Sequence, residues 1–238
     1  MRVTLLFAVV TSLAPAAANA QPVPDVVTRR EAIEHFWSGQ DFLARERWEQ
    51  AAGEFRRAIV LNPLLTDAHY GLGQAQMGLR RYVNAALAFQ SCIEAARKLH
   101  GLRERARVYN DQQIWDEVDE IRDTIRRRGN DLRARQLEHY VSTLLSNRSS
   151  LGLPFEPPAP VLLALGSAHF RNGDRSRAEY YWREAARVDT DLGEAWNNLA
   201  AVYAATGRKP LAEEAISHAE HAGFRVNPRL KDEIKAMQ

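Results

Sequence analysis

The chain has 238 residues, of which 45% are hydrophobic and 26% are charged, and its formal net charge is +2. This composition is typical of an ordinary folded protein, and it excludes both a largely disordered chain and a membrane-embedded body. The single cysteine, Cys92, excludes a disulfide within one chain and a thiolate-rich zinc site.

Residues 1–20 have the three parts of a secretory signal peptide. Arg2 supplies a short positive start, an apolar run follows over residues 3–13, and Ala18-Asn19-Ala20 forms a cleavage site of the small-x-small type. The apolar run is shorter than the roughly 20 residues that a membrane-spanning helix needs. We therefore expect export to the periplasm or beyond, with a mature chain that starts at Gln21. The alternative is an N-terminal helix that stays in the fold.

After an N-terminal extension over residues 21–31, the sequence contains four units with a period of 34 residues. The units are residues 32–65, 66–99, 159–192 and 193–226. Position 8 is always a small residue: Gly39, Gly73, Gly166 and Ala200. Position 20 is always alanine: Ala51, Ala85, Ala178 and Ala212. Position 24 is always bulky: Phe55, Phe89, Trp182 and Ile216. Position 7 is leucine in three units, and Ser38 is the exception. Small residues at positions 8 and 20 predict two antiparallel helices that cross closely, with position 24 filling the space toward the next unit.

This order of small and large residues resembles the tetratricopeptide repeat (TPR) family, most clearly over residues 69–89 and 195–212. The resemblance implies an all-α, right-handed solenoid of helical hairpins. Arg97 departs from the pattern, because it stands where the family usually has a proline that ends the unit. Residues 227–238 then predict a capping helix, in which Asn227 and Pro228 begin the first turn and Leu230 and Ile234 cover the last repeat.

Residues 100–158 interrupt the period. They contain two helical patterns, over residues 112–128 and 131–147, with Asp111 capping the first and Gly129-Asn130 separating the two. A proline-rich spacer follows over residues 153–160. We interpret this segment as an inserted, non-TPR helical hairpin. It either stacks as a fifth pair in a continuous solenoid, which we favour because its apolar faces need a partner, or it separates two pairs of repeats.

No set of residues in the sequence predicts catalysis, so we expect no enzyme activity, no cofactor and no metal. Cys92 occupies a column that is alanine in the other units, which predicts a packed core thiol. His218 and His221 lack a third ligand and are expected to be surface residues. Acidic neighbours offset the basic run over residues 126–128, so we expect no nucleic-acid partner. The mature chain is not expected to span a membrane.

The TPR resemblance further implies that the first helix of each repeat lines a concave groove. Carried over to this sequence, it predicts that a protein or peptide partner contacts Phe36, Trp37, Gln40, Tyr70, Gln74, Met77, Phe170, Asn197 and Asn198. The family's Lys/Arg/Asn clamp for a peptide C-terminus is not visible, so the groove suits an apolar or amphipathic segment. The aromatic residues could instead be covered by residues 22–30 or by the inserted hairpin.

These observations predict an exported scaffold or adaptor that binds another protein through its concave face, in cell-envelope assembly. The alternative is a self-associating structural protein, a homo-oligomer that uses the apolar faces of the insertion or of the first repeat.

Overall fold

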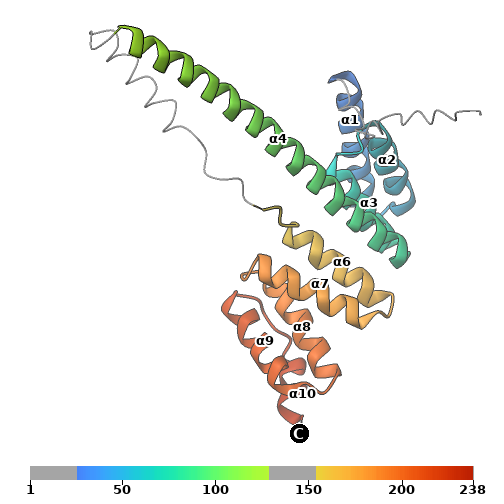
Figure 1. Ribbon diagram of the computed structural model, residues 1–238. Coiled ribbons are helices and arrows are strands. Elements are labelled where there is room, and N and C mark those ends of the chain that lie inside the picture. The colour runs from blue at the N-terminus through green and yellow to red at the C-terminus, as the bar shows by residue number, and fades with distance from the viewer. Residues whose placement is uncertain (1–25, 129–153, 238) are drawn as a thin grey trace, which may run out of the picture.

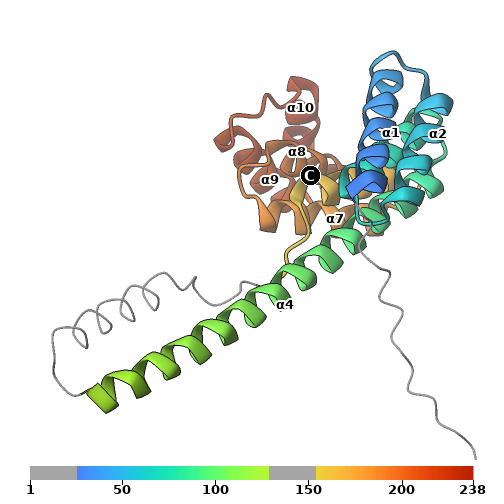
Figure 2. The same cartoon turned by 90° about the horizontal axis from the view of Figure 1, so that it is seen from above.

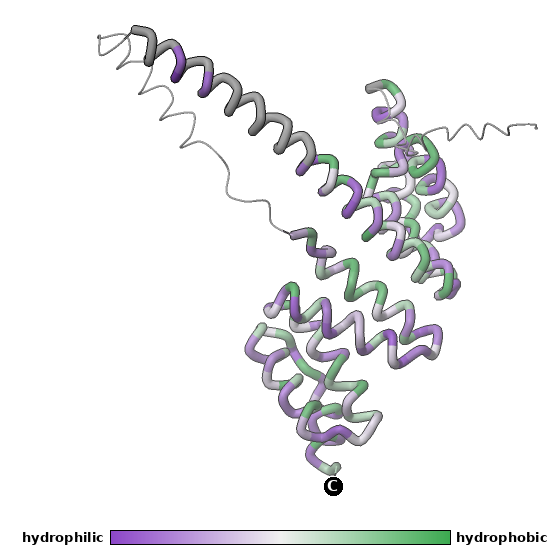
Figure 3. Tube along the Cα trace, in the orientation of Figure 1, coloured by the Kyte–Doolittle hydropathy of each residue, from purple (hydrophilic) through white to green (hydrophobic). Residues whose placement is uncertain are grey.

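A computed structural model describes residues 26–128 and 154–237, and within those ranges the chain forms nine α-helices and no strand. The helices are α1 (Val26–Ala44), α2 (Trp48–Leu61), α3 (Thr66–Gly78), α4 (Tyr82–Arg128), α6 (Ala159–Arg171), α7 (Arg175–Val188), α8 (Gly193–Ala205), α9 (Lys209–His221) and α10 (Pro228–Ala236). Consecutive helices pair as hairpins, and the hairpins stack in chain order (Figure 1). Hydrophobic and hydrophilic residues recur along each stacked helix, as expected of helices that bury one face (Figure 3). The all-α solenoid of helical hairpins expected from the sequence is confirmed.

The helices of each hairpin cross where the sequence places its small residues. A Cβ atom added to Gly73 would lie 2.4 Å from the Phe89 ring, and one added to Gly166 would lie 2.6 Å from the Trp182 ring. Position 8 is therefore glycine in repeats one to three, because the bulky residue at position 24 of the partner helix occupies the space of a side chain. The four alanines at position 20 are fully buried in the same crossings.

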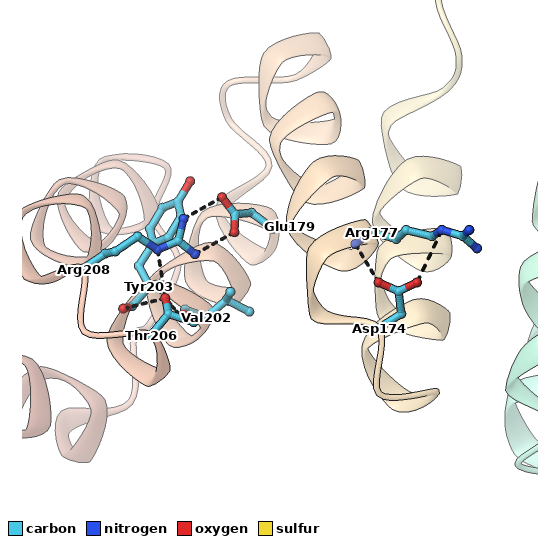
Figure 4. Close-up of polar contacts among 7 residues, drawn as sticks. All are labelled: Asp174, Arg177, Glu179, Val202, Tyr203, Thr206 and Arg208. Carbon is cyan, nitrogen blue, oxygen red and sulfur yellow. Dashed lines mark hydrogen bonds and ion pairs between the residues drawn. The ribbon is translucent and has the colours of Figure 1, made fainter.

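The turns between paired helices follow local signals in repeats three and four. Gly173 and Gly207 have φ values of +87° and +73°, in the left-handed region that suits glycine after a helix end. The Asp174 carboxylate then accepts a hydrogen bond from the Arg177 backbone N–H over 3.0 Å, which caps α7 (Figure 4).

The expectation of a separate helix that begins after Asp111 is wrong. Helix α4 continues without a break from Tyr82 to Arg128, so the second helix of repeat two and the first arm of the insertion are one helix of 47 residues. The missing proline at Arg97 is the physical reason, since no residue removes a backbone N–H before the insertion. Gly101 alone costs only about 1 kcal/mol in a helix interior. The second expected arm, residues 131–147, lies outside the described residues.

Repeats two and three pack directly on each other, so neither arrangement expected for the insertion is correct. Phe89 and Ile93 of α4 share one buried cluster with Leu162 and Leu165 of α6. Among the described residues no further helix lies between these repeats, because α4 and α6 are in direct contact. The C-terminal half of α4 instead projects away from the stack (Figures 1 and 2).

The chain returns to the stack through an extended segment at residues 154–158, in agreement with the spacer expected there. The Phe155 ring lies 5.7 Å from the His100 ring, and the Arg97 guanidinium lies 5.3 Å from the same phenyl ring. Glu156 pairs with Arg187 of α7 at 3.0 Å. These contacts hold the segment before α6 against α4 and α7.

Helix α10 covers the last repeat, as expected. The Asn227 side chain accepts a hydrogen bond from the Arg229 backbone N–H over 3.0 Å, and Pro228 occupies the first turn. Ile234 is buried and Leu230 is half-buried against the core of repeats three and four. Lys209 of α9 donates to the carbonyl oxygens of Lys235 and Met237 at the C-terminus of α10.

At the other end, α1 begins at Val26, so residues 26–31 belong to the first helix and not to an extension before it. The expected signal peptide lies outside the described residues. Within the ranges that the structure describes, no helix combines the length and the apolar character needed to cross a membrane.

Candidate functional site

A pocket of about 500 Å³ lies along the first helices of repeats one to three. We call it the inner pocket. Its lining comes from α1, α3 and α6, with one residue each from α2 and α4, and comprises Gln40, Leu43, Ala44, Trp48, Tyr70, Gln74, Met77, Phe89, Ala164 and Ser167. Because each repeat contributes the same face of its first helix, the pocket follows the axis of the stack.

The lining of the inner pocket carries amide and hydroxyl groups but no charged side chain. Gln40, Gln74 and Ser167 occupy position 9 in three successive repeats, and they form a polar row. The Ser167 hydroxyl donates to the Leu163 carbonyl over 3.0 Å and keeps its lone pairs for a further donor. Each glutamine amide can both donate and accept, which matches the alternating N–H and C=O groups of an extended peptide.

Tyr70 and Met77 add apolar surface beside this row. The Tyr70 ring packs at 5.5 Å from the buried Phe89 ring, which fixes its position at the base of the pocket. Burial raises the pKa of Tyr70 above its usual value of 10.0, and the nearby Cys92 and Glu194 raise it further. The phenol therefore stays neutral at physiological pH and can donate a hydrogen bond.

The pocket brings together four of the nine residues that the sequence predicts for partner binding: Gln40, Tyr70, Gln74 and Met77. Phe36 is half-buried against Phe55, with ring centres 6.1 Å apart, and forms part of the core of repeat one. Phe170 packs against Trp182 at 5.4 Å and remains 42% exposed outside the pocket. Asn197 and Asn198 are half-buried on α8, also outside the pocket.

Trp37 lies outside the pocket as well, although it is 63% exposed and its ring touches Phe36 at 5.2 Å. Residues 26–30, which were expected as a possible cover for these aromatic rings, are instead the first turns of α1. Residues 22–25 are outside the described part of the chain.

Trp48 is a pocket residue that the sequence did not indicate. It begins α2, and its indole ring occupies the space beside Gly78, where an added Cβ would lie only 2.4 Å from a ring atom. The ring thus reaches from repeat one to the end of the first helix of repeat two. A glycine at the end of a helix has other common explanations, so the pair could not be recognised from spacing alone.

Cys92 and His218, which were considered as candidates for catalysis or metal binding, pack against neighbouring groups of the fold. The Cys92 thiol is buried, donates to the Thr66 carbonyl over 3.3 Å, and has its pKa raised to about 11, chiefly by burial. The expectation of a packed core thiol is confirmed. His218 is exposed and stacks on Trp196 at 4.3 Å. Among the described side chains, no group of three or more His, Cys, Asp and Glu residues is arranged to hold a metal ion.

Comparisons with solved structures found several TPR proteins of low sequence identity. A thermophilic TPR protein from Thermus thermophilus is 19% identical, with 87% of this chain and 98% of that chain covered and a TM-score of 0.38. PilF of Pseudomonas aeruginosa is 16% identical, with coverage of 86% and 81% and a TM-score of 0.36. YrrB, described as a TPR protein with an unusual peptide-binding site, is 15% identical, with coverage of 86% and 91% and a TM-score of 0.30.

No curated protein matched the chain in sequence. The tetratricopeptide repeat family model matches two stretches, residues 38–100 and 163–223, which together make up just over half of the chain. These stretches coincide with the two pairs of helical hairpins on either side of the projecting part of α4. The chain therefore belongs to the tetratricopeptide repeat family.

Proposed function

We propose that this protein is an exported scaffold whose inner pocket binds an extended, uncharged or amphipathic segment of another protein. The TPR fold is in general a non-catalytic scaffold for protein–protein interaction, which agrees with this proposal. The observation that carries it is the row of Gln40, Gln74 and Ser167 at one position of three successive repeats, inside a single pocket.

The polar row supports recognition of the peptide backbone. Side chains on equivalent positions of stacked hairpins recur at a regular interval along the groove, and an extended segment offers its own polar groups at regular intervals. Amide side chains satisfy both the donors and the acceptors of such a segment, whereas a row of single-sign charges would select for charged ligands. The absence of charged groups from the lining therefore favours a neutral stretch of the partner.

The apolar surface supports the affinity of the site. Tyr70, Met77 and Leu43 can bury an apolar side chain of the partner, and burial of one such side chain is worth about 1.5–3 kcal/mol. Tyr70 is held by Phe89, so little side-chain freedom is lost when a ligand binds. The apolar contacts anchor the segment, and the amide groups set its direction.

Export is the second part of the proposal, and the signal-like sequence of residues 1–20 supports it. It is tested by expressing the full chain in its native host and measuring the mass of the protein recovered from the cell envelope. Cleavage before Gln21 is expected. An intact N-terminus on a protein that stays in the cytoplasm would exclude export and envelope assembly, while leaving the binding proposal open.

Binding is tested by comparing what matched variants capture from the compartment in which the protein resides. Gln74→Ala and Met77→Ala remove one polar and one apolar contact from the inner pocket. Leu87→Ala is the control, because Leu87 is 56% exposed on α4 and lies outside the pocket. The pocket variants are expected to lose a partner that the wild type and the control both retain. Equal capture by all four proteins would exclude the inner pocket as the binding site.

A further inference from the structure

The first helix of repeat one differs from the other first helices on the face that would meet a preceding repeat. In repeat two, Ala68 and Ala75 at positions 3 and 10 are buried against Phe55 and the alanines of α2. The same columns, together with position 7, are apolar in repeats three and four, where they hold Val161, Leu165, Ala168, Ala195, Leu199 and Val202, all buried. These three columns are therefore the ones with which a repeat packs on its predecessor.

In repeat one, each of these columns holds a polar residue: Glu34, Ser38 and Asp41. Glu34 and Asp41 are exposed and Ser38 is half-buried. This explains why Ser38 breaks the leucine column at position 7, since no repeat packs there within the described chain. The outer face of α1 thus has the polar character expected of the first layer in a solenoid.

Trp37 is the largest exposed apolar side chain on this side of α1, where Val27 and Ile33 are also exposed. It occupies position 6, and at position 6 of repeat two a Cβ added to Gly71 would lie 2.5 Å from the Phe55 ring of the preceding repeat. In repeat two, position 6 therefore also points toward the preceding layer, whereas Ala164 at position 6 of repeat three lines the inner pocket. In repeat one this position carries a tryptophan that is 63% exposed, next to Ile33, Glu34 and Asp41, which are exposed as well. Hot spots of protein–protein interfaces are often a tryptophan surrounded by polar or charged residues.

We propose that this face of α1 binds the same face of a second copy of the chain, with the two α1 helices antiparallel and Trp37 at the centre. Arg30, Glu34, Trp37 and Asp41 are spaced by four, three and four residues, so they form one stripe along the helix. In an antiparallel pair centred between His35 and Phe36, Arg30 of each copy lies opposite Asp41 of the other.

The charges of this stripe are the reason for proposing that the binding partner is a second copy of the chain. Arg30 and Asp41 form no ion pair within the part of the chain that the structure describes, and the antiparallel register gives the dimer two Arg30–Asp41 pairs. The same register places the two Trp37 rings about 4.5 Å apart along the helix axis, close enough to pack on each other. In this register Glu34 of each copy lies opposite Trp37 of the other, and Ser38 lies opposite Ile33. This surface is separate from the inner pocket, so it does not depend on the proposed peptide site.

Sedimentation equilibrium of the full chain, expressed with its own N-terminal segment, tests the proposal. We expect a reversible monomer–dimer equilibrium, whose dissociation constant rises about tenfold or more in Trp37→Ala. Arg30→Asp and Asp41→Arg should each weaken the dimer because each creates two like-charge pairs. The double variant Arg30→Asp/Asp41→Arg should restore it. Tyr180→Ala is the control, because Tyr180 is 59% exposed on α7, far along the chain from this face.

Circular dichroism and thermal unfolding of each variant establish that it is folded, which is expected since the substituted side chains are exposed. A chain that stays monomeric at every concentration overturns the proposal, and so does a dimer that Trp37→Ala leaves unchanged. A dimer that depends on Trp37 but is not restored by the double charge exchange overturns the antiparallel register and with it the assigned interface.

Discussion

Arg208 donates hydrogen bonds to both carboxylate oxygens of Glu179, over 2.9 and 2.6 Å, and thereby joins repeat four to repeat three (Figure 4). The same guanidinium lies 4.6 Å from the centre of the Tyr203 ring and donates from Nε to the Thr206 hydroxyl over 2.9 Å. The Glu179 and Arg208 side chains are 20% and 35% exposed, so the pair is only partly screened by water. Its geometry is bidentate and its residues come from successive hairpins, and it therefore fixes how the hairpins stack.

The Glu179–Arg208 ion pair predicts a contribution to the free energy of unfolding that depends on pH. The hydrogen bond from Arg208 holds the pKa of Glu179 below its usual value of 4.5. A carboxylate with a lowered pKa in the folded state contributes stability above the pKa of the unfolded state, and this contribution is lost as the pH falls through the folded pKa. We expect Glu179→Gln to lower the free energy of unfolding by about 1 kcal/mol at pH 7. Urea unfolding at a series of pH values should show this difference shrinking below about pH 4.5. A difference that stays constant down to pH 3 would contradict the assignment to this ion pair.

The close crossing at position 8 predicts opposite effects for two Gly→Ala variants. Gly166→Ala places a methyl group 2.6 Å from the Trp182 ring and should lower the free energy of unfolding by about 1–3 kcal/mol. Gly53→Ala, inside α2, has no atom within 4 Å of the added carbon and should raise it by about 0.5–1 kcal/mol. Chemical denaturation measures both. Equal effects would mean that helix propensity, and not the crossing, decides the residue at position 8.

Much of the solenoid could be predicted from the sequence, because each repeat uses the same contacts. Columns such as Gly73 with Phe89 report a contact within one hairpin, and four copies of the pattern distinguish it from chance. The continuity of α4 could not be predicted from a repeated pattern. Arg97 in place of proline only removes a signal that would end the helix, and it does not by itself predict that the helix continues. The inner pocket was predicted in part: position 9 faces it in three repeats, whereas Trp48 reaches it from outside the repeated groove positions. Position 6 differs between repeats: Ala164 of repeat three lines the inner pocket, whereas Gly71 of repeat two lies against Phe55 of the preceding repeat.

The length of α4 gives a prediction that distinguishes one helix from two. Glu94 and Asp119 are both exposed and both lie in α4, 25 residues apart. At 1.5 Å per residue, spin labels at these sites should be about 38 Å apart along a straight helix. Pulsed electron resonance on the doubly labelled chain should show a single narrow distribution near that value. A clearly shorter or bimodal distribution would indicate a break near Asp111.

The cap at the C-terminal end predicts a local loss of stability. Ile234 is buried under repeat four, and Ile234→Ala should cost about 2–5 kcal/mol at that end of the stack. Since each repeat contacts mainly its neighbours, amide hydrogen exchange should accelerate in α8 and α9 and change little in α1 to α3. Lys235→Ala, at an exposed position of the same helix, is the control. Uniform acceleration along the whole chain would show that the repeats unfold as one unit.

A partner segment bound in the inner pocket is expected to lie against Gln74. A photo-crosslinking residue placed at Gln74 in cells should yield a covalent adduct with a partner protein, and one placed at Leu87 on the outer side of α4 should not. Competition by excess uncrosslinked wild-type protein should remove the adduct. An adduct at Leu87 without one at Gln74 would show that the partner binds a surface other than the inner pocket.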